Sequence, residues 1–360
     1  LEAAHWADEA GEGPALGAWA RQQLGGLLLR LGRWAEAAEV LESALADLTA
    51  ETHGDGAVVQ TQWWLGDALS ELGEHRAAAE RRLQAAEIAR HWPEQQDHAT
   101  LAHLAAESLS RAGLLTEADA AYTRAGELWR TVGSVHGVVR ALRARAWLAV
   151  RGDSGGGSEA GAGLDSGAGA GAAVGAGAGA GSEVGAGAGS SAGGEVGSGD
   201  EVGSGSEAGA SVGVRAAREL MADAVAECRA ALGGAVDDEE RFRLTDELGS
   251  SHQQFGELLA RCAADEDEAL LAEALSQTEQ AVAVFAGLGP AAWHDRTGAQ
   301  LTAARLAADL GRLAEATAHA RAVLTACDDA TAPAPGDDLT AARRADASRL
   351  LRLLEERAGK

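Results

Sequence analysis

The chain has 360 residues and a formal net charge of -25, with 55 acidic residues against 30 basic ones. This excess of acid disfavours nucleic acid and anionic membranes as main partners, because both bind to cationic surfaces. Aromatic residues make up only 4% of the chain, too few for a sheet-rich protein, so the composition predicts an all-α fold.

The three cysteines, Cys228, Cys262 and Cys327, are far apart, and no C-x-x-C occurs. The pattern predicts neither a disulfide framework nor a zinc site, and it favours a reducing, cytoplasmic location. No apolar run approaches the roughly 18 residues of a membrane-spanning helix. The chain begins at Leu1 within an apparent helix, so we interpret it as a piece of a longer protein.

The first clear element pair surrounds Gly32. The apolar stripe before Gly32 is formed by Leu24, Leu28 and Leu31, and the stripe after it by Trp34, Ala37, Leu41, Ala44 and Leu45. Both stripes have helical spacing. Gly32 stands where a helix end needs a left-handed residue, so the segment predicts helix, tight turn, helix.

The same setting returns along the chain, at Gly73, Gly113, Gly152 and Gly311. From Gly32 to Gly152 the spacings are 41, 40 and 39 residues. A fixed period in this range predicts a stacked array in which each unit buries its apolar face on its neighbours. We therefore expect a right-handed α-solenoid of about six antiparallel helix pairs.

Residues 153–213 are rich in glycine, alanine and serine, and all of their charged residues are acidic. Such a segment cannot bury enough apolar surface to fold, so we predict a disordered insert. Repeats are then expected in 1–152, and further repeats with a C-terminal capping helix in 214–360. A first helix at 137–151 lacks its second, and one at 214–232 lacks its first, so we predict that they pack together. The alternative is a linker between two separate domains.

This repeat resembles the tetratricopeptide family, in a long-repeat bacterial form of actinobacterial character. The first unit carries the family pattern at Leu24-Gly25, Gly32, Trp34, Ala37 and Ala44. The second unit carries it at Leu65-Gly66, Gly73, Ala78 and Ala85, with His75 in place of the aromatic residue. The units run near 40 residues, longer than the family's norm.

The resemblance implies a groove, lined by the first helices, that binds a peptide or a partner helix. The residues at the matching places are Gln22, Trp63, Asp67, Glu71, His103, Glu107, Arg111 and Arg143. The family subgroup that holds a C-terminal carboxylate uses lysine, asparagine and arginine there. This chain has Gln22, Gly26, Trp63 and Asp67 at the first matching places, which favours a more basic or mixed partner.

Motifs for catalysis are absent from the sequence, which contains no phosphate-binding loop, no H-E-x-x-H and no G-x-S-x-G. His103 and Glu107 lie four apart and could ligate a metal, but a solvated polar face explains them better without further ligands. Of the adjacent Trp63 and Trp64, we expect one to face the groove. The arginines of 140–151 either bind an anion or pair with acids on adjacent helices.

We therefore expect a non-catalytic, cytoplasmic scaffold that binds a protein and needs no cofactor or metal. The alternative function is the C-terminal sensor or regulatory arm of a larger bacterial transcription regulator or signalling NTPase.

Overall fold

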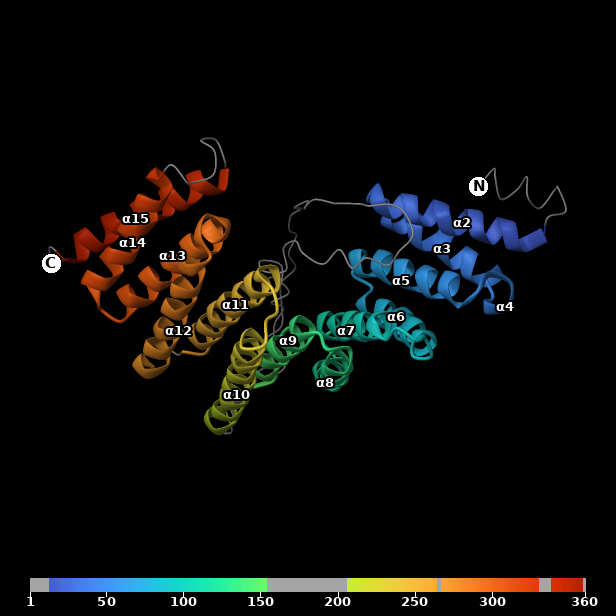
Figure 1. Ribbon diagram of the computed structural model, residues 1–360, viewed down its shortest axis with the longest axis horizontal. Coiled ribbons are helices and arrows are strands. Elements are labelled where there is room, and N and C mark those ends of the chain that lie inside the picture. Colours follow the sequence, from blue (N-terminus) through green and yellow to red (C-terminus); the bar gives the residue numbers. More distant parts are fainter. Residues whose placement is uncertain (1–12, 154–205, 264–266, 330–337, 359–360) are drawn as a thin grey trace, which may run out of the picture. The chain divides into compact units, whose positions relative to one another are not determined.

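The computed structural model describes residues 13–153, 206–263, 267–329 and 338–358 (Figure 1). Every regular element in these ranges is a helix, so the predicted all-α class is confirmed. The chain divides into two compact units after Leu128, and α9 to α15 belong to the second.

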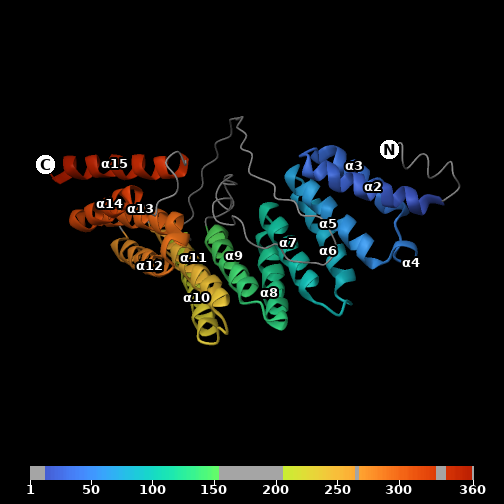
Figure 2. The ribbon, with the colours of Figure 1, turned by 45° about the horizontal axis from the view of Figure 1, so that its top comes forward.

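The helices of unit 1 are α2 (Gly13–Arg30), α3 (Trp34–Asp47), the single-turn α4 (Ala50–His53), α5 (Asp55–Glu71), α6 (His75–Ala89), α7 (Gln96–Arg111) and most of α8 (Leu115–Val132). Those of unit 2 are α9 (Val135–Asp153), α10 (Ser206–Leu232), α11 (Asp238–Cys262), α12 (Glu268–Gly287), the short 3-10 helix η1 (Gly289–Ala292), α13 (Trp293–Asp309), α14 (Leu313–Asp328) and α15 (Asp338–Ala358). Within each unit, successive helices form tetratricopeptide-like pairs (Figures 1 and 2).

Glycine ends the first helix of each clear pair. The φ angles of Gly32, Gly73, Gly113 and Gly311 are 68°, 80°, 76° and 72°, all in the left-handed region. At Gly73 the backbone N–H donates to the carbonyl of Ser70 (3.1 Å), and the next N–H, of Glu74, donates to Leu69 (2.8 Å). These two bonds make a Schellman motif, which satisfies carbonyls that the helix end leaves unpaired.

Gly152 does not occupy such a turn. It lies inside α9, one residue before the helix ends at Asp153, and its φ is outside the left-handed region. Among the described residues, the left-handed glycine nearest to it is Gly133 (φ 78°), where the N–H of Ser134 donates to the carbonyl of Trp129 (2.9 Å). The turn of this type therefore precedes α9, and the spacing of 39 residues to Gly152 was a misleading signal.

Small residues set the close approach of paired helices. Ala37, Ala44, Ala78 and Ala85 are completely buried. A Cβ added at Gly25 would collide with the side chain of Leu41, so the glycine of the Leu-Gly pair leaves room for the second helix. Leu31, which we expected on the apolar stripe with Leu24 and Leu28, is instead 69% exposed at the end of α2.

Helices α9 and α10 share one hydrophobic cluster, although residues 154–205 separate them. The cluster contains Ala146 of α9 with Ala217 and Met221 of α10, and Trp147 and Leu220 pack against it. Both views draw the two helices side by side (Figures 1 and 2). α10 begins at Ser206, eight residues before the expected position 214 and inside the expected insert. The predicted disorder of 153–213 falls almost entirely outside the described residues.

Candidate functional site

Two helices of unit 1 carry most of the predicted groove residues. Trp63, Asp67 and Glu71 follow one another at intervals of four on α5, and His103, Glu107 and Arg111 do so on α7. Residues four apart lie on the same side of a helix. We call these six residues the first-helix face of unit 1.

A buried arginine beneath this face joins α5, α6 and α7. Arg82, on α6, is only 6% exposed. Its guanidinium donates to Asp67 Oδ1 on α5 (2.7 Å) and, on α7, to Ser108 Oγ (2.5 Å) and the carbonyl of Leu104 (3.2 Å). Charge-assisted hydrogen bonds of this kind are stronger than neutral ones. Arg82 therefore fixes the position of Asp67 relative to α7.

Gly66 makes room for this arginine. A Cβ at Gly66 would lie 2.9 Å from Cγ of Arg82 and 3.2 Å from its Nε. Burial raises the pKa of Asp67, while the charge of Arg82 and its hydrogen bond act against this rise. In the second unit, the glycine of the Leu-Gly pair thus leaves room for a polar side chain, Arg82. In the first unit, the corresponding Gly25 leaves room for an apolar one, Leu41.

Charges of both signs meet at one end of the face. Arg111 Nη1 approaches Ser70 Oγ on α5 at 3.5 Å. Burial lowers the pKa of His75, as do the charges of Arg111 and Arg82, whereas Glu71 raises it, so both Glu71 and Arg111 lie near this histidine. Their side chains are exposed and remain available to a partner.

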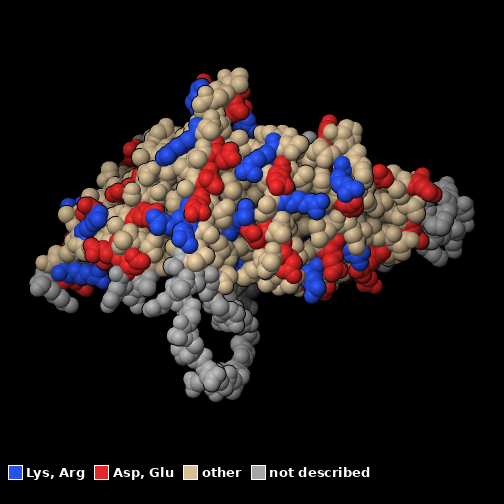
Figure 3. Space-filling model, turned by 90° about the horizontal axis from the view of Figure 1, so that it is seen from below, with Lys and Arg blue, Asp and Glu red and all other residues tan. Residues whose placement is uncertain are grey.

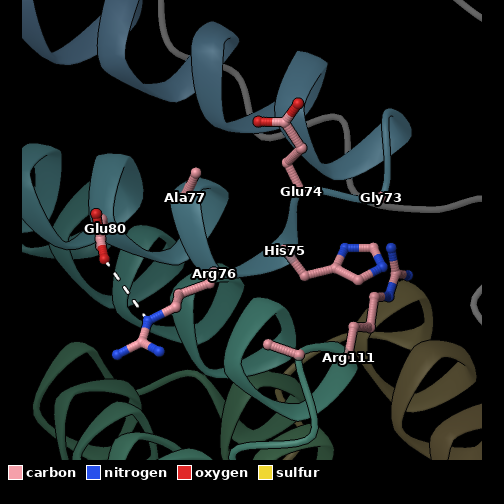
Figure 4. Close-up of a pocket in the computed structure, with 8 residues that line it drawn as sticks. Gly73, Glu74, His75, Arg76, Ala77, Glu80 and Arg111 are labelled. Atoms are coloured by element: carbon pink, nitrogen blue, oxygen red, sulfur yellow. Dashed lines mark ion pairs between the residues drawn. The ribbon is translucent and has the colours of Figure 1, made fainter.

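An open pocket of about 520 Å³ adjoins this end of the face. It is lined by Gly73 and Glu74 of the turn between α5 and α6, by the first three residues of α6, by Glu80, and by the end of α7. Figure 4 shows the His75 ring and the Arg111 guanidinium lying next to each other there, with the Arg76–Glu80 ion pair (3.9 Å) on the far side. The lining of this pocket includes side chains of both charges, among them Arg76, Glu80 and Arg111.

Two predicted groove residues are buried rather than presented at the surface. Gln22 is 2% exposed, and its Nε2 donates to the carbonyl of Ala57 (3.0 Å) and to Gln60 Oε1 (3.4 Å). His103 is 3% exposed; its ring meets Tyr122 edge to face with centroids 5.2 Å apart, and its Nε2 lies 3.4 Å from Glu107 Oε1. Both side chains therefore support the helices from within.

Trp63 and Trp64 are both partly buried, and each packs against a different cluster. Trp63 packs against a cluster that contains Val59 and Leu101, and Trp64 packs against another that contains Leu65. Adjacent helical residues face different neighbours, so each ring finds its own contacts. Both rings stay partly accessible.

Arg143 belongs to unit 2 and lies in an ion-pair cluster of its own. Its Nη1 is 2.8 Å from Glu247 Oε1 on α11, and His136 on α9 contacts the same carboxylate. Burial raises the pKa of Glu247, but the hydrogen bond from His136 and the charge of Arg143 bring it below its usual value. Arg143 thus pairs with an acid on an adjacent helix.

Sequence reasoning missed Arg82 and an apolar strip on α2. Arg82 stands at a core position of a second helix, and the sequence there gave no signal for its role. The one hint is that Arg82 follows Gly66 at the same interval at which Leu41 follows Gly25. On α2, Leu16 (40%), Trp19 (51%) and Leu27 (48%) are exposed at helical spacing. The described residues do not show what covers this strip.

Among the described residues, no group of three or more His, Cys, Asp and Glu side chains is placed to bind a metal ion. None of the described helices combines the length and apolar character needed to cross a bilayer. On the face drawn in Figure 3, basic and acidic side chains are interspersed.

Comparison with known proteins gives likeness at the level of structure only. No protein-family pattern and no curated protein matches the sequence. Among solved structures, BtubC (BKLC) from P. vanneervenii matches 86% of this chain and 94% of its own, at 13% identity and a TM-score of 0.49. A second match is a signal transduction ATPase with numerous domains from Pyrococcus horikoshii, which has a tetratricopeptide repeat sensor. It matches 94% of this chain at 12% identity with a TM-score of 0.49, and the match covers 39% of the ATPase.

The TPR2AB domain of yeast Sti1, solved in complex with pHSP90, is also similar, at 13% identity over 94% of this chain and 98% of its own, with a TM-score of 0.30. These likenesses are weak. The assignment of a tetratricopeptide-like fold therefore rests on the helix pairs, the left-handed glycines and the packing of the chain itself.

Proposed function

We propose that the protein is a non-catalytic helical-repeat scaffold that binds a segment of another protein through the first-helix face of unit 1. The observation that carries the proposal is the connection made by Arg82, which holds Asp67 of α5 and the backbone of α7 in one arrangement. A surface held in place before binding loses less entropy when the partner docks.

The charges of the first-helix face indicate which charges a partner segment should carry. Asp67, Glu71 and Glu107 are acidic, and Arg111 is the basic residue at one end. A segment with basic residues along most of its length and an acidic group near Arg111 is electrostatically complementary to this arrangement. Trp63, partly accessible near the middle of α5, offers an apolar contact of the kind that is enriched in protein interfaces.

Site-specific photocrosslinking in cells tests this proposal. A photoreactive amino acid at Glu71 should crosslink to one discrete protein, because this exposed residue lies on the face. The matched control is the same amino acid at Glu87, which is exposed on α6 and pairs with Arg90 (3.0 Å). Identical crosslinked products from both positions would refute a specific role for the first-helix face.

A further inference from the structure

A second pocket, of about 470 Å³, lies between α10, α11 and α12 within unit 2. Its polar lining consists of Arg229 on α10, His252 on α11, and Gln277 and Gln280 on α12. Val225 and Phe255 are among its apolar lining residues. The volume falls in the range of small-molecule sites.

The hydrogen bonds of the pocket fix which atoms donate. Arg229 can only donate, so its contact with His252 Nε2 (3.2 Å) makes Nε2 the acceptor. The neutral imidazole must then carry its proton on Nδ1 and donate to Gln277 Oε1 (2.7 Å). Arg229 also donates to Gln280 Oε1 (3.2 Å). Both glutamine carbonyls are thereby used, and both Nε2 amide groups are left as donors.

The charge of Arg229 is not neutralised by the protein. Its contacts, with His252 and Gln280, are to neutral groups, and it forms no ion pair among the described residues. Acidic neighbours on α10 and α12 have other partners: Glu227 pairs with Arg130 (3.4 Å) and Glu273 with Arg218 (2.7 Å). No acidic residue lines the pocket as the structure describes it.

We infer that this pocket binds the carboxylate of an organic acid with an apolar body. The guanidinium of Arg229 and the amides of Gln277 and Gln280 supply donors to the carboxylate, and Phe255 and Val225 contact the apolar part. His252 is only 2% exposed and holds two of the polar side chains in place. This site lies outside the first-helix face and is independent of the proposed partner binding.

Titration of the 360-residue chain with phenylacetate, followed by the imidazole ¹⁵N signals of His252, tests this inference. Phenylacetate should shift the His252 signals in a saturable way, and the uncharged phenylacetamide should bind at least about tenfold more weakly, because it lacks the charge-assisted bond. N-acetylphenylalanine, which imitates a peptide C-terminus, is titrated in parallel. Tighter binding of this probe would assign the carboxylate to a peptide, and tighter binding of phenylacetate to a free acid.

Two variants and a matched control separate the site from general charge effects. Arg229→Gln should weaken phenylacetate binding about tenfold or more. Ala226→Trp, which fills the pocket and keeps its polar side chains, should abolish binding. Arg215→Gln removes the same charge from an exposed position on α10 and should leave binding unchanged. The inference is overturned if phenylacetamide or inorganic phosphate shifts His252 equally well, or if Arg229→Gln binds like the unaltered chain.

Discussion

Replacing Arg82 tests the connection beneath the first-helix face. Arg82→Met keeps much of the apolar stem but removes the guanidinium and its bonds to Asp67, Ser108 and the carbonyl of Leu104. Breaking a fully buried ion pair costs about 3–5 kcal/mol, but the Asp67 side chain is 40% exposed, so water compensates much of its loss. Ser108 Oγ still donates to the carbonyl of Leu104 (3.0 Å). We therefore expect the free energy of unfolding to fall by about 2 kcal/mol.

Urea denaturation followed by circular dichroism measures this loss, and hydrogen exchange assigns it to α5, α6 and α7. A double-mutant cycle with Asp67→Asn should give a coupling energy of about 1 kcal/mol between the two side chains. The reasoning is refuted if Arg82→Met is as stable as the unaltered chain. It is equally refuted if the cost of Arg82→Met is the same with and without Asp67→Asn.

Gly66→Ala should destabilise the chain by about 1–3 kcal/mol, because the added Cβ would displace Arg82. In an Arg82→Ala background this cost should largely disappear. An equal cost in both backgrounds would contradict the close contact between Gly66 and Arg82. Gly73→Ala should lower the stability of the chain by about 1 kcal/mol, whereas Gly56→Ala should leave it unchanged or raise it. Both positions have space for a Cβ, but only Gly73 has a left-handed φ (80°). Equal melting temperatures of the two variants would argue against a role for this φ angle. Burial lowers the pKa of His252, and the charge of Arg229 lowers it further, although the hydrogen bond to Gln277 acts against both. As the pH falls, this histidine therefore takes up a proton in the unfolded chain before it does so in the folded chain. Unfolding titrations should show stability declining below pH 6.5 and a smaller decline in His252→Gln; identical pH profiles would exclude this histidine as a source of the decline.

The periodic features of the fold were predictable, because each follows from local chemistry. Gly32, Gly73, Gly113 and Gly311 stand at helix ends where a left-handed residue satisfies the last carbonyls. Gly152 shares their spacing but not their place, because the preceding turn is made by Gly133 and α9 continues through residue 152. Spacing alone does not tell a helix end from a helix interior.

The candidate site was predictable only in part, because burial depends on the neighbouring helices. The interval of four residues correctly grouped Asp67 with Glu71 and Glu107 with Arg111 on their helices. It could not show that Gln22 is buried beneath α5, where its amide satisfies Ala57 and Gln60. The role of Arg82 depends on three helices that meet only in the folded chain.

The affinity of the crosslinked partner for charge-exchanged variants tests the central claim most directly. The variant Glu71→Lys with Arg111→Glu exchanges two exposed charges of the first-helix face and keeps the net charge. The control, Glu87→Lys with Arg90→Glu, makes the same exchange at the C-terminal end of α6. We expect the first variant to weaken binding about tenfold or more while the control binds like the unaltered chain. Equal affinities for the two variants would contradict binding at this face.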